Sequence, residues 1–324
     1  MMIKTRLTKM LNIDLPIIEG GMAWVGTPKL AAVISECGAL GTIGTGSLEP
    51  DEVKQKIREI RELTNKPFAV NLIMLNPHFD KLIDLVIDED VPVVILAAGN
   101  PGKYIEKLKE NKVKVFTVVS SDSLGKRCEN NGADAIIGEG MECGGHIGDV
   151  STLVLVQKLL KVVDIPVIAA GGIATGEAIA GMLTIGAEGV QLGTAFIATK
   201  ECEAHEKYKE KIIKSGIRST AITGEKLGHP VRVLKTGFAR KVKKAELTSP
   251  EEAEELLINS LARAFINGDE LDGSFMAGQS AGMINEVKTV SELLGSLMED
   301  AEYSMKKVLN KFDISKTDLL EVKK

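Results

Sequence analysis

Aromatic residues and cysteines are scarce in this 324-residue sequence, and their scarcity excludes several classes of protein. Phe, Trp and Tyr make up 4% of the chain, too few for the stacking platforms of proteins that bind single-stranded nucleic acids. The four cysteines show no CxxC spacing, so we expect neither a disulfide framework nor a metal site. Lys and Arg number 40 against 45 Asp and Glu, a net charge of −5. A nucleic-acid partner is not expected, because such proteins carry a clustered basic excess.

Long apolar runs are also missing. Charged residues interrupt the most apolar region, 153–173, so no stretch reaches the roughly 18 residues of a membrane helix. Residues 1–16 lack the uninterrupted apolar core of a signal peptide. We therefore expect a cytoplasmic protein with reduced thiols and no membrane segment.

Glycine is abundant by contrast, with 32 residues, and most glycines follow short β-branched runs. Short apolar runs bounded by Gly, Pro or polar clusters are predicted as buried strands. They cover 16–18, 39–43, 68–72, 93–97, 113–118, 133–137, 166–170 and 189–192. Segments with helical periodicity separate them, and several have a Pro near their start.

Strands that are apolar on both faces and alternate with helices predict a parallel sheet covered by helices. Eight such units favour a closed (β/α)8 TIM barrel, an α/β fold. A doubly wound open sheet is the alternative, but no GxGxxG motif follows the first strand.

A TIM barrel needs about 250 residues, so part of this 324-residue chain lies outside the barrel. The segment 199–272 is polar and charge-dense and shows no pattern of paired short strands. It is predicted as a small helical lid, or substrate domain, inserted after the eighth strand. The barrel is expected over 1–198 and 273–324, ending in an amphipathic helix over 290–309.

Two glycine-containing loops follow the seventh and eighth predicted strands: Gly171-Gly172 and Gly193-Thr194. TIM barrels commonly bind phosphate at these two loops, because backbone N–H groups and a following helix N-terminus attract the oxygens. The pair therefore predicts a phosphate site. Ordinary tight turns are the alternative interpretation.

His146 lies in a glycine-rich loop after the sixth predicted strand. Gly144, Gly145 and Gly148 leave its imidazole free to project over a ligand, and imidazole is the usual proton-transfer group near neutral pH. A structural histidine is the alternative. Cys143 could act as a nucleophile beside it, although no third group to orient the pair is visible.

Five ordered motifs resemble the flavin-dependent enoyl-acyl-carrier-protein reductase II (FabK) family and, more broadly, the nitronate monooxygenase (2-nitropropane dioxygenase) superfamily. The motifs are 16–24, 139–148, 169–173, 191–194 and 276–279. The resemblance runs over nearly the whole chain and implies a barrel that binds FMN non-covalently. It assigns the FMN phosphate to Gly171, Gly172, Gly193 and Thr194. Its other implied cofactor-binding residues are Gly21, Met22, Asn71, Glu139, Gly145, Gln191, Met276, Ala277 and Gln279.

The resemblance also implies a reaction, the last reduction of fatty-acid elongation. NADH or NADPH would reduce FMN, and flavin N5 would pass hydride to the β-carbon of a trans-2-enoyl thioester. His146 would polarise the thioester carbonyl, donate the proton, or do both. The rival within the superfamily is a nitronate monooxygenase, in which His146 acts as base on a nitroalkane and oxygen reoxidises the flavin. A non-catalytic phosphate-ligand or flavin-binding protein would need the loops but not His146.

The predicted lid contains a run of cations without an acid between residues 232 and 244. An acyl carrier protein is acidic, so the run is a candidate docking site for it. A solvated surface and a site for the nicotinamide dinucleotide's pyrophosphate are the alternatives. Apolar faces on the lid and the last helix are compatible with a homodimer. The cations are Arg232, Lys235, Arg240, Lys241, Lys243 and Lys244.

Overall fold

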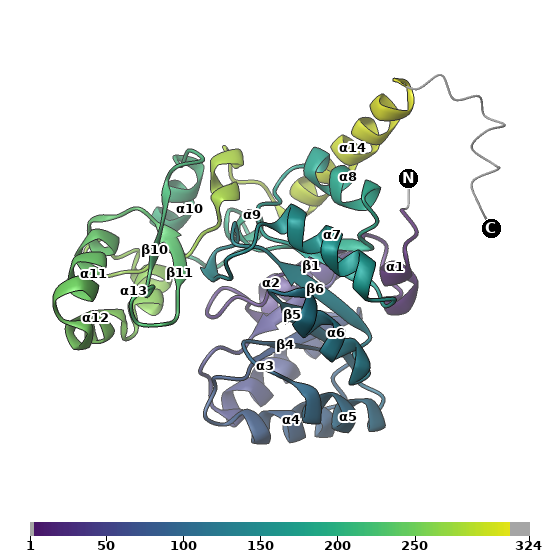
Figure 1. The fold of residues 1–324 in the computed structure, drawn as a ribbon, viewed down its shortest axis with the longest axis horizontal. Coiled ribbons are helices and arrows are strands. Elements are labelled where there is room, and N and C mark those ends of the chain that lie inside the picture. Colours follow the sequence, from purple (N-terminus) through teal and green to yellow (C-terminus); the bar gives the residue numbers. More distant parts are fainter. Residues whose placement is uncertain (1–2, 312–324) are drawn as a thin grey trace.

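The computed structural model describes residues 3–311 and confirms the predicted barrel of eight parallel strands (Figure 1). The strands run in the order β1-β9-β8-β6-β5-β4-β3-β2, and a parallel bridge from Ile18 to Leu40 joins the two ends of the sheet. The barrel strands are β1 (Ile17–Glu19), β2 (Gly41–Gly44), β3 (Phe68–Ile73), β4 (Val93–Ala97), β5 (Lys114–Val119), β6 (Ala135–Glu139), β8 (Val167–Ala170) and β9 (Gly189–Leu192). Residues 1–2 and 312–324 of the predicted barrel lie outside the described part.

Helices alternate with these strands and begin at recognisable caps. Thr27 and Thr175 accept N–H groups at the starts of α2 and α8, and Pro occupies the first turn of α2 and α3. The barrel helices are α1 (Arg6–Leu11), α2 (Pro28–Glu36), α3 (Pro50–Leu63), α4 (Phe79–Asp88), α5 (Gly102–Glu110), α6 (Asp122–Asn130), α7 (Thr152–Val162), α8 (Gly176–Thr184), α9 (Thr194–Ile197) and α14 (Val290–Leu309). The last of these is the helix predicted over 290–309, and it packs on α8. No helix within residues 3–311 is long and apolar enough to cross a membrane.

The apolar residues form two layers. One fills the space between the strands and the surrounding helices, and the other fills the barrel interior. Leu7, Leu11 and Ile13, from α1 and the turn after it, join the interior layer and close the amino-terminal end of the barrel. The carboxyl ends of the strands are therefore the open end, where TIM barrels place their active sites.

The lid lies to one side of the barrel, drawn in green in Figure 1. It contains a sheet as well as helices, so the prediction of a lid without paired strands is wrong. β10 and β11 pair antiparallel, and β11 also pairs with the two-residue β7 of the barrel. Each lid strand has only four residues, too few for a clear alternating pattern in the sequence. The lid elements are α10 (Glu206–Ile213), β10 (Thr220–Thr223), β11 (Val231–Leu234), α11 (Gly237–Thr248), α12 (Pro250–Leu257) and α13 (Ser260–Asn267); β7 is Gly145–His146, and the 3-10 helix η1 (Gln279–Met283) leads back to the barrel.

Candidate active site

A cavity of about 620 Å³ opens at the carboxyl ends of the strands, a volume typical of small-ligand sites. Most of the residues predicted from the sequence line it together: Gly21, Met22, Asn71, Glu139, Gly145, His146, Gly171, Gly172, Gln191, Gly193, Thr194 and Met276. Ala277 and Gln279 do not line it, and their neighbours Gly278 and Ser280 do. The backbone N–H of Gln279 instead donates to the Glu142 carbonyl, at 2.9 Å.

One side of the cavity consists of the loops after β8 and β9. Gly171 and Gly172 have φ values of +97° and +73°, a backbone region that favours glycine. Within residues 3–311, the N–H groups of Gly172 and Gly193 donate to no protein acceptor. Gly278 donates its N–H to Thr194 Oγ1 at 2.9 Å and so ties the segment before η1 to the same side. Free N–H groups on glycine backbone that faces a cavity are the donors a phosphate requires.

The loop after β1 approaches β3 so closely that a side chain at position 21 would displace Asn71. A Cβ on Gly21 would lie 2.2 Å from Cγ of Asn71. Asn71 is buried, and its amide Nδ2 donates to the Ile95 carbonyl at 3.3 Å. This contact holds the Asn71 amide at the cavity surface, with its oxygen available to a ligand.

Gln191 supplies a test of whether a polar ligand fits. Its side chain lines the cavity and is 7% exposed, yet Oε1 has no hydrogen-bond partner. A buried amide oxygen without a partner costs free energy, which a ligand donor would offset. The Gln191 amide and the free glycine N–H groups together fit a polar cofactor that carries a phosphate.

The opposite side of the cavity is apolar, and the sequence reasoning missed it. Side chains at the ends of β3, β4 and β5 form it, with Leu124 from α6. The same strand-end rule that selected the polar loops would have pointed to them. Ala98, directly after β4, has a φ of +58°, uncommon for a residue with a Cβ. The residues of this apolar side are Ile73, Leu75, Ala97, Ala98, Val118, Val119 and Leu124.

His146 lies where the lid meets the barrel, and it lines the cavity while remaining exposed to solvent. Its backbone, as part of β7, pairs with Val231 of β11. Desolvation lowers the pKa of His146 below 6.5, and the charge of nearby His229 lowers it further. The shift favours the neutral imidazole, which donates a hydrogen bond through one ring nitrogen and accepts one through the other.

Glu139 and Cys143 are neighbours on the cavity floor. Desolvation raises the pKa of Glu139 to about 7, although a hydrogen bond with Cys143 opposes the rise. Desolvation and the adjacent Glu139 raise the pKa of the Cys143 thiol well above its usual range. Cys143 Sγ also lies 3.4 Å from the His146 carbonyl oxygen, so its one proton can go to either acceptor. Cys143 is therefore a buried structural thiol rather than a nucleophile.

Glu142 has a structural role. Its carboxylate accepts hydrogen bonds from the backbone N–H and the hydroxyl of Thr152, at 3.0 and 2.9 Å. These contacts anchor the His146 loop at the start of α7.

The cationic run of the lid is not one surface. Arg232 is 4% exposed and its guanidinium points inward, so its predicted place in a docking patch is wrong. As part of β11, it lies between two paired strands. Lys241 forms a 3.6 Å ion pair with Asp272, and the other four cations, Lys235, Arg240, Lys243 and Lys244, are exposed.

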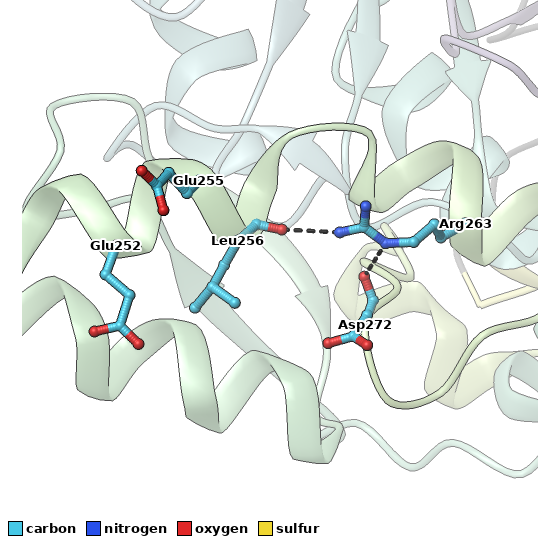
Figure 2. A pocket seen from close by; sticks show the side chains of 5 residues that line it. All are labelled: Glu252, Glu255, Leu256, Arg263 and Asp272. Carbon is cyan, nitrogen blue, oxygen red and sulfur yellow. Dashed lines mark hydrogen bonds between the residues drawn. The ribbon is translucent and has the colours of Figure 1, made fainter.

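A second, shallower cavity of about 340 Å³ lies within the lid (Figure 2). Its single cation, Arg263, donates to the backbone carbonyls of Asp272, Ile258 and Leu256 at 2.8 to 3.0 Å. Figure 2 shows two of these bonds. The guanidinium is thus committed to holding the turns around α13 and has little capacity to bind an anion.

Comparison with known proteins places the chain in a family. The family model described as nitronate monooxygenase matches residues 4–81 and 75–300. A probable nitronate monooxygenase from Staphylococcus saprophyticus is 33% identical over 336 residues, covering 89% of this chain and 95% of the relative.

Two solved structures are similar over most of the chain. FabK from Thermotoga maritima is 52% identical with a TM-score of 0.95, covering 96% of this chain and all of that one. Nitroalkane oxidase from Streptomyces ansochromogenes is 28% identical with a TM-score of 0.83, covering 93% of this chain and 99% of that one. The chain is therefore an oxidoreductase-type TIM barrel that belongs to the nitronate monooxygenase family.

Proposed function

We propose that the chain is an FMN-containing, NADH- or NADPH-dependent reductase of trans-2-enoyl thioesters carried by an acyl carrier protein. The observation that carries this proposal is the 52% identity and 0.95 TM-score with FabK, against 28% identity with the nitroalkane oxidase. The apolar side of the cavity supports it, because an acyl chain needs such a surface and a small nitroalkane does not.

The cavity residues divide into two groups by their chemistry. Gly171, Gly172, Gly193 and Thr194 would hold the FMN phosphate, and Gly21, Asn71 and Gln191 would bind the flavin ring and its ribityl chain. When bound, FMN supplies hydride transfer between the nicotinamide and the substrate. The apolar residues from β3 to β5 would bind the acyl chain and exclude water from it.

Neutral His146 would donate its N–H to the thioester oxygen. Hydride addition at the β-carbon leaves negative charge on that oxygen, and a positioned donor stabilises the charge. Because desolvation lowers the pKa of His146, the neutral imidazole is favoured over the imidazolium at pH 7 and above. The α-carbon proton would then come from water.

The pH profile tests this role of His146. Above the lowered pKa the imidazole stays neutral, so kcat/KM for a small enoyl thioester is expected to be flat from about pH 7 to pH 8.5. If imidazolium were the obligatory acid, kcat/KM would fall about tenfold per pH unit over that range. Steady-state rates in buffers of constant ionic strength make the measurement, and an NADH-only flavin reduction rate at each pH is the control.

Carrier docking is expected on α11. Arg240, Lys243 and Lys244 are exposed and spaced at i, i+3 and i+4, so they share one helix face with the exposed Leu247. Reversing the three charges to Glu is expected to raise KM for a carrier-bound enoyl substrate about tenfold, since each exposed pair contributes roughly 0.2–1 kcal/mol. KM for a small enoyl thioester should not change.

Reversal of Lys81 and Lys103, exposed on α4 and α5, is the matched control. An equal rise in KM for both substrates in the α11 variant, or the same rise in the control, would contradict docking at this face.

The second candidate function is nitronate oxidation, favoured by the nitronate monooxygenase name of the 33% identical relative. A steady-state assay separates the two. The reductase should consume NADH or NADPH only when an enoyl thioester is present, at the same rate with and without oxygen, and form the saturated thioester. Oxygen-dependent consumption of a nitronate, with no thioester reduction, would support the second candidate.

A further inference from the structure

Arg232 is a buried cation at the junction between the lid and the barrel. It is 4% exposed, and its guanidinium forks between two elements. Nε and one terminal nitrogen donate to the Met141 carbonyl at 3.0 and 2.8 Å, and the other terminal nitrogen donates to Thr220 Oγ1 at 3.0 Å. A buried charge is retained at a free-energy cost unless its hydrogen bonds compensate for it. The three donors are committed to the His146 loop and to β10.

The strand that carries Arg232 pairs with two segments that line the cavity. On β11, Arg232 and Val231 pair with Gly145 and His146. The next residue, Val233, bridges to Met276. The lid strand β11 therefore fixes the position of the His146 loop relative to the segment that contains Met276.

The loop itself is rich in glycine, although Thr152 also holds it through two hydrogen bonds to Glu142. It contains four glycines between positions 140 and 148, and Gly145 has a φ of +78°. A loop this rich in glycine loses more conformational entropy when it becomes ordered than an ordinary loop does. An external anchor at the Met141 carbonyl reduces the freedom of the segment that leads to His146.

We propose that Arg232 is a positioning residue, which fixes the His146 loop to the lid and so sets where the imidazole stands over the substrate. It contacts neither substrate nor cofactor and acts through Met141, Gly145 and His146. A displacement of about 1 Å at a reacting group can cost about 100-fold in rate, so the anchor matters for catalysis even though it lies behind the cavity wall. The inference rests on the proposed function for its kinetic readout only.

Arg232→Gln and Arg232→Lys test the hydrogen bonds that the guanidinium makes to Met141 and Thr220. Thr220→Val removes only the hydrogen bond to β10. Arg232→Gln is expected to lower kcat for a small enoyl thioester about 10- to 100-fold, while KM and the rate of flavin reduction by NADH or NADPH change less than about threefold. Arg232→Lys should recover little, because an ammonium is not a planar fork. Thr220→Val should give a smaller loss of the same kind. Arg218→Gln, which removes an exposed lid arginine, is the matched control.

The reactivity of Cys143 gives a readout that does not depend on any activity. The Cys143 thiol is 7% exposed and lies 3.4 Å from the His146 carbonyl oxygen, so a loosened loop should expose it. In a Cys37→Ser background, which removes the one cysteine that is not buried, Arg232→Lys should raise the rate of Cys143 modification by the thiol reagent DTNB at least tenfold, because it breaks the fork but keeps the positive charge that favours the Cys143 thiolate. The modified residue is identified by mass spectrometry.

The outcomes separate the two proposals. Faster Cys143 modification with no thioester reduction in any variant, parent included, would support the anchor and contradict the reductase. Unchanged Cys143 modification in the Arg232→Lys and Thr220→Val variants would overturn the anchor whatever the activity. Full rescue of kcat by Arg232→Lys would also overturn it, because charge rather than the fork would then suffice.

Discussion

His146→Ala is expected to lower kcat for a trans-2-enoyl thioester about 10²- to 10³-fold while the purified protein stays yellow. The imidazole lies on the cavity where the barrel meets the lid, and the glycine N–H groups that would hold the phosphate belong to other loops, those after β8 and β9. Losing a positioned hydrogen-bond donor to a developing oxyanion costs about 2.7–4 kcal/mol. This cost applies to the half-reaction in which the enoyl thioester reoxidises the flavin. Reduction of the flavin by NADH or NADPH should change little.

Single-turnover measurement of each half-reaction makes the comparison. His205→Asn is the matched control, because His205 caps α10 outside the cavity and accepts the Lys207 N–H through Nδ1. Unchanged turnover in His146→Ala would remove His146 from the mechanism. Loss of bound flavin in that variant would instead make His146 a cofactor-binding residue.

Gly171→Ala is expected to give a protein purified without its cofactor. An added Cβ would lie 2.9 Å from both the Gly140 carbonyl oxygen and Thr152 Oγ1, on a backbone with a φ of +97°. Strain and overpacking together cost about 2–4 kcal/mol. The relaxed loop would move the adjacent Gly172 N–H away from the phosphate, and the loss of one charge-assisted hydrogen bond lowers FMN affinity about 10- to 100-fold.

Gly181→Ala is the matched control on the same β8–α8 unit. Gly181 lies inside α8, and a Cβ there meets no atom within 4 Å. This variant should be more stable by about 0.5–1 kcal/mol and bind FMN normally, because alanine restricts the unfolded chain. Titration of the apoproteins with FMN, followed by quenching of the single tryptophan, Trp24, gives the affinities. Normal FMN affinity in Gly171→Ala would contradict the assignment of the phosphate site.

The barrel could be predicted because its signals are local. Residues 93–97 and 189–192 are apolar runs between turn residues, and the structure makes both of them strands with the same bounds. The glycines at 171, 172 and 193 could likewise be found, since strand ends in a parallel barrel all meet at one face.

The lid sheet and the role of Arg232 could not be predicted, because both depend on contacts between distant residues. β11 joins β7 across 85 positions of sequence, from Val231 back to His146. In the sequence Arg232 is the first of six cations and looks like part of a charged surface. Only the pairing of β11 on both edges turns its side chain inward, toward the Met141 carbonyl.

An anaerobic single-turnover experiment tests the central claim most directly. The protein is mixed with one equivalent of NADH or NADPH in the absence of oxygen, and a trans-2-enoyl thioester is added once the yellow absorbance has gone. The account predicts that the nicotinamide bleaches the flavin and that the thioester restores its colour, with one equivalent of saturated thioester formed. A flavin that a nitronate bleaches and NADH or NADPH does not, or a bleached flavin that only oxygen restores, would contradict it.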